Sequence, residues 1–538
     1  MTGRGGSMKI IEKVRSRDVW PGRAWTLVTF ALLALMLLAA HTYRFSDRSY
    51  REDELNTLHA ARVLSPSGVF QWMAAGGFHP ALWRVTATSW VSAFGDAEPV
   101  TRYFSTLLTL LTLALVYRLG TDLFDRQAGL IAALILGALP FYQFYGHELR
   151  PYSALALCTA GILVTFLRWL RHQDFTSALL YVMFGAAGLH VHYFALYVLA
   201  AQGLVFLALV RWDRGVYVRA FGLFFAIGLA YSPWVLSILH GALVTNEGGI
   251  DYEMSSSWSG FELLNQNLQG LPVFLLPGLL IPVGLVYPFY KFRAEYRVPA
   301  LRFDPEWRRW YLIGHTVAIL LLTFVGNLIL ANLTARNMMI LVPALAVLGG
   351  FLIRAFQWRL RLVLVLAFVA LALFVFHSYA PDIPYRQIVA FVDESYEPGD
   401  CVVTNLNHNG APSTVMTYAL LDWLSAGIPK ENIFHFVEPE IRATFATPPD
   451  KIPPVYKDAS PETLALFEAF LAKTDHVFFI DYYGSPLYRF TPLTETFVAI
   501  LEHDFEPVRE KTWLTPMPES VDADWYRITE YRRKGADE

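Results

Sequence analysis

The sequence places ionisable side chains at short turns between long apolar stretches. The first are Asp53 and Glu54, in the segment SYREDELNTLHAARVL, which follows a strongly apolar stretch at 24–42. An acid beside a bilayer is costly unless it is solvated or used, so this position favours a functional site. Neighbours in a helix point about 100° apart, so we expect Asp53 at or before a helix start and Glu54 in the first turn. The alternative is that Asp53 only caps the helix and Glu54 complements its dipole.

A histidine precedes a proline in GGFHPALW, residues 76–83. Because the residue before proline avoids the helical conformation, we expect His79 in an extended or turn conformation and a helix that starts at Pro80. An imidazole there can coordinate a metal ion or donate a hydrogen bond to a phosphate. The alternative is an ordinary polar loop residue.

The segment FYGHELRPYSALAL, 144–157, joins two apolar stretches by a very short turn. Its ionisable and aromatic side chains are Tyr145, His147, Glu148, Arg150 and Tyr152. A turn that only connects two helices rarely needs so many of these groups, so a functional site is favoured. The alternative is an ion pair between Glu148 and Arg150 that contributes little to stability. Pro151 is placed to be the first residue of the following helix.

Two further turns carry residues that can bind anions. GLHVHYFALYVL, 188–199, contains His190, His192 and Tyr193. Histidines two positions apart in an extended turn point to one side, where they can bind a metal or a phosphate; the alternative is anchoring at the membrane interface. Arg336 stands beside Asn337 at the start of an apolar stretch. An anionic head group at the membrane surface would explain this cation.

The elements that must position these residues are membrane helices. The 538 residues are 55% hydrophobic and only 17% charged, with mean hydropathy +0.37, which excludes an ordinary soluble domain. We predict an α-helical polytopic membrane protein with about eleven transmembrane helices. The predicted spans are 24–42, 103–119, 128–146, 151–169, 176–190, 193–210, 216–239, 271–290, 310–330, 338–354 and 361–378.

The basic residues of the connecting loops predict the orientation. One set of loops carries sixteen arginines and lysines, whereas the short loops on the other side carry Arg150 and Arg336 only. The positive-inside rule puts the first set in the cytoplasm, together with the basic N-terminus. An odd number of spans then places loop 43–102 and the C-terminal tail outside. All the candidate residues would therefore lie at the external ends of different spans.

The tail differs in pattern from the rest of the chain. Short apolar runs such as DCVVTNL, NIFHFV and HVFFIDYY alternate with helical segments such as PETLALFEAFLAK. This alternation predicts an external α/β domain at 379–538 after a membrane domain at 1–378. Cys158 lies in an apolar stretch and Cys401 in the tail, so no disulfide framework is expected.

In their order and shared side, these motifs resemble the GT-C superfamily of polytopic glycosyltransferases. The similarity is to the bacterial branch of the protein mannosyltransferase group, which includes aminoarabinose transferases and lipopolysaccharide-core sugar transferases, and it covers residues 24–350. The matching motifs are Asp53-Glu54, His79-Pro80-Ala81-Leu82, Glu148-Leu149-Arg150-Pro151-Tyr152, His192-Tyr193-Phe194, and Arg336 with Pro343.

The resemblance implies an inverting transfer of a sugar from a polyprenyl-phosphate donor to an acceptor hydroxyl on a lipid, a glycan or a protein. Asp53 would be the general base, Arg150 and Arg336 would stabilise the departing phosphate, and Glu54 or Glu148 would orient the acceptor or a cation. The remaining candidates for substrate binding are His79, His147, Tyr152, His190, His192 and Tyr193.

The resemblance also bears on cofactors and location. Some relatives bind a metal through an acid at the place of Phe78, so a divalent metal is left open, with His79, Glu148 and His190 as candidate ligands. The expected location is the inner membrane, with the site facing the periplasm and membrane lipid around it. No nucleic-acid partner is expected.

Three other functions are compatible with a polytopic chain. A transporter or flippase would need ionisable groups at mid-bilayer, and the spans contain no acid near a helix centre. A ligase of the same fold would use a diphosphate donor instead. A scaffold would use the membrane part only as an anchor for the tail.

Overall fold

The structure is a computed structural model that describes most of the chain. The described residues are 50, 52–70, 80–210, 213–244, 305–330, 333–378, 385–405, 428–436, 455–456, 458–483, 492–515 and 524–535. The predicted spans 24–42 and 271–290 lie outside them, and so does His79.

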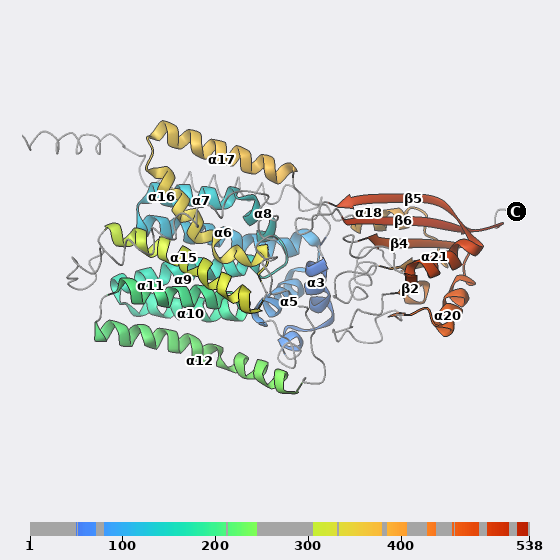
Figure 1. The fold of residues 1–538 in the computed structure, drawn as a ribbon, viewed down its shortest axis with the longest axis horizontal. Coiled ribbons are helices and arrows are strands. Elements are labelled where there is room, and N and C mark those ends of the chain that lie inside the picture. Colours follow the sequence, from blue (N-terminus) through green and yellow to red (C-terminus); the bar gives the residue numbers. More distant parts are fainter. Residues whose placement is uncertain are drawn as a thin grey trace, which may run out of the picture.

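A body of packed helices makes up the first part of the chain (Figure 1). Each of the other nine predicted spans coincides with one helix or with two consecutive short helices. Their bounds are α6 (Glu98–Leu123), α7 (Arg126–Ala138), α8 (Pro140–Gly146), α9 (Tyr152–His172), α10 (Phe175–Val191), α11 (Ala195–Leu209), α12 (Arg214–Val244), α15 (Pro305–Leu330), the 3₁₀ helix η2 (Ala335–Ile340), α16 (Val342–Arg354) and α17 (Trp358–Ser378).

Several of these helices have the length and surface of membrane spans. Within the described ranges, α6, α9, α12 and α15 are long and apolar enough to cross a bilayer, and α7 with α8 forms a further span if this pair, bent by 64°, is one unit. On α12, Phe221, Phe225 and Leu229 follow one another at helical spacing and are all exposed. An apolar ridge of this kind on the outside of a helical body is suited to contact with lipid.

Glycines let neighbouring helices approach closely. A Cβ atom on Gly129 of α7 would collide with the Tyr117 carbonyl oxygen of α6. A Cβ on Gly350 of α16 would collide with the Ala128 carbonyl oxygen of α7. Small residues are favoured at such crossings in membranes, where van der Waals packing rather than a hydrophobic driving force holds helices together.

Among the described residues, α3 (Glu52–Val63) and α5 (Leu82–Phe94) precede α6 and lie at the end of the body that is nearest the sheet (Figure 1). Because α3 begins at Glu52, Asp53 is its second residue. The expectation that Asp53 lies at or before the helix start is therefore wrong by one residue. Three consecutive acids in the first turn favour this earlier start, since each complements the positive end of the helix dipole.

The described part of the tail forms a six-stranded mixed sheet. Its strands are β1 (Cys401–Thr404), β2 (Ile433–Phe436), β3 (Val455–Tyr456), β4 (His476–Tyr483), β5 (Phe505–Thr515) and β6 (Asp524–Arg533). In the order β3-β2-β1-β4-β6-β5, the first four are parallel and β6 runs antiparallel to both of its neighbours.

Both faces of this sheet are covered by helices. Along β1, Cys401 and Val403 pack with α20 (Pro461–Leu471) and α21 (Pro492–Asp504), whereas Val402 points to the face that packs on α18 (Tyr385–Asp393). Successive side chains of a strand alternate between faces, so a strand buried on both sides is apolar throughout. This explains the continuous apolar runs in the tail.

One buried histidine of the sheet makes its stability depend on pH. Burial on β2 lowers the pKa of His435 to about 4, and the Thr404 backbone opposes this effect only in part. The unfolded chain binds a proton at this histidine near pH 6.5, whereas the folded chain does not until about pH 4. We therefore expect full stability of the sheet above pH 6.5 and a loss of roughly 3 kcal/mol as the pH falls from 6.5 to 4.

This prediction can be checked by hydrogen–deuterium exchange of the strand peptides in the purified full-length protein, corrected for the intrinsic pH dependence of exchange. His435→Leu should remove most of the loss of protection between pH 6.5 and 4. His503→Leu is the matched control, because His503 lies on the surface of the same domain. Equal pH dependence in the parent protein and His435→Leu would contradict the prediction.

Candidate functional site

The ring of Tyr152, the first residue of α9, is the point where the predicted turns meet. The Cζ atom of Arg150 lies 6.0 Å from the ring centroid and that of Arg336 lies 5.9 Å from it. The imidazole of His192 lies 6.2 Å from the same ring, centroid to centroid. Three turns that are far apart in the sequence therefore place two cations and a histidine around one aromatic side chain.

The turn that carries Arg150 is tight and begins α9. The Arg150 N–H donates to the Glu148 carbonyl at 2.7 Å, and Pro151 precedes the first helical residue, with φ −66°. The sequence placed Pro151 as the first residue of the helix, one position earlier than the structure starts it. The fixed φ of proline suits either position.

The turn that carries Arg336 is the 3₁₀ helix η2. It follows Leu333, whose N–H donates to Asn327 Oδ1 of α15 at 3.0 Å. This hydrogen bond ties the start of the turn to the end of the preceding helix. Arg336 itself is half-buried, while Asn337 beside it is buried.

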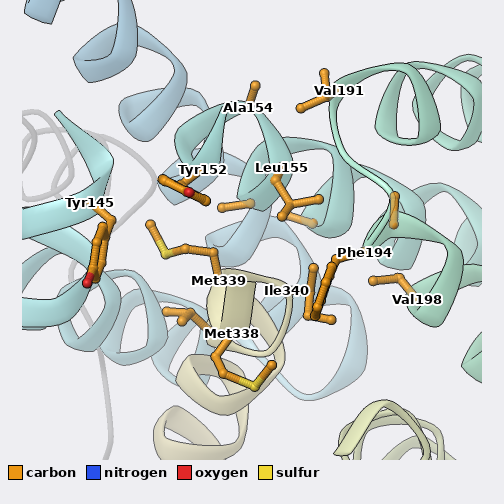
Figure 2. Close-up of a cluster of buried hydrophobic side chains, with 14 of the residues drawn as sticks. Tyr145, Tyr152, Ala154, Leu155, Val191, Phe194, Val198, Met338, Met339 and Ile340 are labelled. Carbon is orange, nitrogen blue, oxygen red and sulfur yellow. The ribbon is translucent and has the colours of Figure 1, made fainter. Parts of the chain in front are cut away.

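An apolar cluster supports the ring of Tyr152. Figure 2 shows Tyr145 and Leu155 with side chains from α11 and with Met338, Met339 and Ile340 of η2. The Tyr145 and Tyr152 rings meet edge to face, 5.7 Å apart. Aromatic pairs prefer this geometry, and dense packing fixes the ring on which the two arginines lie.

A buried ion cluster holds α3, the helix that begins with three acids, against the turn that carries Arg150. Arg102 of α6 donates to Glu54 at 3.1 Å and pairs with Glu98 at 2.6 Å, and all three side chains are almost completely buried. Glu54 Oε1 also accepts the Leu149 N–H at 2.9 Å. Glu54 therefore points into the protein and joins α3 to the turn that carries Arg150.

Sequence reasoning missed Arg102, because the positive-inside argument counted only the short external loops. The signal that the sequence did contain was the Glu98–Arg102 spacing of i and i+4 at a helix start. What the sequence did not contain was the partner, since Glu54 lies 48 residues away along the chain.

The remaining candidates lie in the turn before α9, in α3 and beside His192. His147 and Glu148 are both buried in the turn, and His147 Nδ1 contacts the Gln143 carbonyl of its own helix. Asp53 lies in the first turn of α3, beside Glu54. Tyr193 is half-buried next to His192.

The two histidines of the 188–199 turn do not share a side, contrary to the sequence prediction. His190 lies in the last turn of α10, where its Nε2 is 3.3 Å from the Ala230 carbonyl and its ring packs on Tyr231, both on α12. His192 comes after the helix end and turns toward Tyr152. The helix continues further than an extended turn would allow, and this separates the two imidazoles.

A set of metal ligands does not emerge from the described residues. Among them, no three His, Cys, Asp or Glu side chains lie close enough together to hold a metal ion. His190, one candidate ligand, faces α12 instead, and His79, another, lies outside the described residues.

Comparisons with known proteins found a matching family model and solved structures of similar fold. Residues 79–236 match the family model described as dolichyl-phosphate-mannose-protein mannosyltransferase. The chain also resembles the crystal structure of ArnT from Cupriavidus metallidurans in the apo state, at 14% identity and a TM-score of 0.54, over 94% of this chain and 98% of that one. The structure of the same ArnT bound to undecaprenyl phosphate matches at 13% identity, with the same TM-score and coverage. No curated protein matches the sequence significantly.

The family match and the shared fold confirm the predicted resemblance to the GT-C superfamily of membrane glycosyltransferases. The family match includes the turns that carry Arg150 and His192. Together with the apolar helices, these findings identify a membrane protein.

Proposed function

We propose that this GT-C-like membrane protein is an inverting glycosyltransferase that moves a sugar from a polyprenyl-phosphate donor to an acceptor hydroxyl at the periplasmic face of the inner membrane. The single observation that carries the proposal is the convergence of Arg150 and Arg336 on the ring of Tyr152. Two guanidinium groups that each lie near the same ring, beside membrane helices, are suited to the phosphate of a lipid that cannot leave the bilayer.

The charge of this site matches the change that the reaction produces. A polyprenyl-phosphate sugar is a phosphodiester with one negative charge. When the bond between the anomeric carbon and the phosphate oxygen breaks, the phosphate keeps the electron pair and its charge grows. Two fixed cations therefore bind the transition state more strongly than the donor, which is the requirement for catalysis. The ArnT structure with bound undecaprenyl phosphate supports a ligand of this class.

Asp53 is the proposed general base. It accepts the proton of the acceptor hydroxyl while the oxygen attacks the anomeric carbon from the side opposite the phosphate, so the configuration inverts. Because Glu54, the next residue, is buried in an ion pair with Arg102, the proton acceptor of the acidic pair is Asp53. His192, which lies against Tyr152, is the proposed hydrogen-bond donor to the phosphate or to the sugar.

The sheet domain is the proposed site of acceptor recognition. It lies next to the end of the helical body that carries α3, and the arrowhead of β4 points toward that end (Figure 1). A lipid, glycan or protein acceptor would approach from the aqueous side, between this domain and the membrane. The predicted orientation, with loop 43–102 and the tail both external, agrees with this arrangement.

The role of Asp53 can be tested by substitution. Asp53→Asn should lower kcat by about 10²-fold or more, because a positioned base contributes roughly 10²–10⁴-fold. The measurement is transfer from a panel of radiolabelled polyprenyl-phosphate sugars by purified protein, with and without chelator. Asp96→Asn is the matched control, since Asp96 pairs with Arg62 near the surface. Transfer by Asp53→Asn at the parent rate would show that the assigned base is wrong.

The two arginines give a second test. Arg150→Met and Arg336→Met should each lower kcat by about 10²–10³-fold, the size of effect seen when one group that stabilises developing charge is removed. Arg62→Met is the control, because this arginine pairs with Asp96 at 2.7 Å near the surface. If Arg62→Met lost as much activity as the other two, general loss of positive charge would explain the result and the site would not be where we place it.

A further inference from the structure

Arg102 has the largest side chain among those buried almost without exposure in the described part of the chain. It lies one helical turn inside α6, between two buried glutamates, with Glu98 at 2.6 Å and Glu54 at 3.1 Å. Its guanidinium also lies 5.3 Å from the centroid of the Tyr50 ring, and the Tyr50 hydroxyl is 2.5 Å from the Thr101 hydroxyl. A buried cation with this many partners is held in one orientation.

The same face of α6 fixes the backbone of the turn that carries Arg150. The Ser105 hydroxyl donates to the Glu148 carbonyl at 2.6 Å, and the Thr109 hydroxyl donates to the Gly146 carbonyl at 2.8 Å. Directly after Glu148, the Leu149 N–H donates to Glu54, which is paired with Arg102. The segment 146–149 is therefore held at three backbone groups, and of these three contacts the one to Leu149 involves the acidic helix α3.

We infer that Arg102 and Glu54 are a positioning pair, which sets the distance between the base on α3 and the phosphate-binding arginine after Leu149. The contacts of this pair are observed, whereas its effect on catalysis rests on the proposed function. Asp53 precedes Glu54 and Arg150 follows Leu149, so one hydrogen bond links the neighbours of both groups. In catalysis, a displacement of about 1 Å can cost about 10²-fold in rate.

The pair acts through charge as well as geometry. A lone buried carboxylate is costly, and breaking a buried ion pair by removing one partner is far more harmful than replacing the whole pair with neutral groups. Arg102→Met takes away the cation that Glu54 and Glu98 share. The repulsion between the two carboxylates would move α3 and release Leu149.

The test compares Arg102→Met with a variant that also carries Glu54→Gln and Glu98→Gln. We expect Arg102→Met to lower kcat/KM by about 10²-fold and to speed hydrogen–deuterium exchange in peptides that cover 144–155. The triple variant removes all three charges of the cluster, and the amide oxygen introduced by Glu54→Gln can still accept the Leu149 N–H. It should therefore recover at least about 10-fold of the loss. Arg118→Met, at the other end of the same helix, removes an exposed partner of Asp122 and is the matched control.

The pH profile separates positioning from catalysis. Glu54→Gln alone should keep the acid limb of the kcat profile at the parent pH, because Asp53 remains the base. Loss of that limb would make Glu54 the base and overturn the inference.

Exchange measurements separate the inference from the proposed function. They need no substrate, so faster exchange at 144–155 in Arg102→Met supports the pair even if no donor is turned over. Parent-like exchange and parent-like kcat/KM in Arg102→Met would overturn it, and so would a triple variant that is more impaired than Arg102→Met.

Discussion

The cost of burying charge beside a bilayer governs the end of the helical body where the candidate site lies. A buried ion repays its desolvation only when opposite charges and hydrogen bonds surround it. Arg102 meets this condition between Glu54 and Glu98, and Glu54 meets it with a second contact to the Leu149 N–H. The acidic helix and the arginine turn are consequently held together by groups that would be destabilising apart.

On the other side of the turn, apolar packing holds in place the aromatic ring beside which the two cations lie. Arg150 and Arg336 lie over the ring of Tyr152, and that ring packs edge to face on Tyr145 above η2 (Figure 2). An aromatic face attracts a cation through its quadrupole and carries no net charge of its own. This ring therefore gathers positive charge without cancelling it, which suits the proposed chemistry on a lipid phosphate.

The helical body and the sheet are stabilised by different physics. In the body, glycines such as Gly129 and Gly350 permit close helix contacts, and apolar side chains on α12 face outward. The sheet instead buries both of its faces beneath helices and keeps the side chain of His435 out of contact with water. A membrane span and a strand of a covered sheet both appear in the sequence as apolar runs, and the length of the run distinguishes them.

The sequence by itself determined the helices and the chemistry of the turns. Hydropathy located nine helical segments of the body within the described residues, because a span must satisfy its backbone internally, and the motifs predicted the resemblance to GT-C enzymes. The tertiary structure alone decided which side chains meet. It turned His190 toward α12 and His192 toward Tyr152, and it gave Glu54 a partner in Arg102. Periodicity reports only neighbours within a helix or strand, whereas these contacts join residues 40 or more positions apart through helix packing.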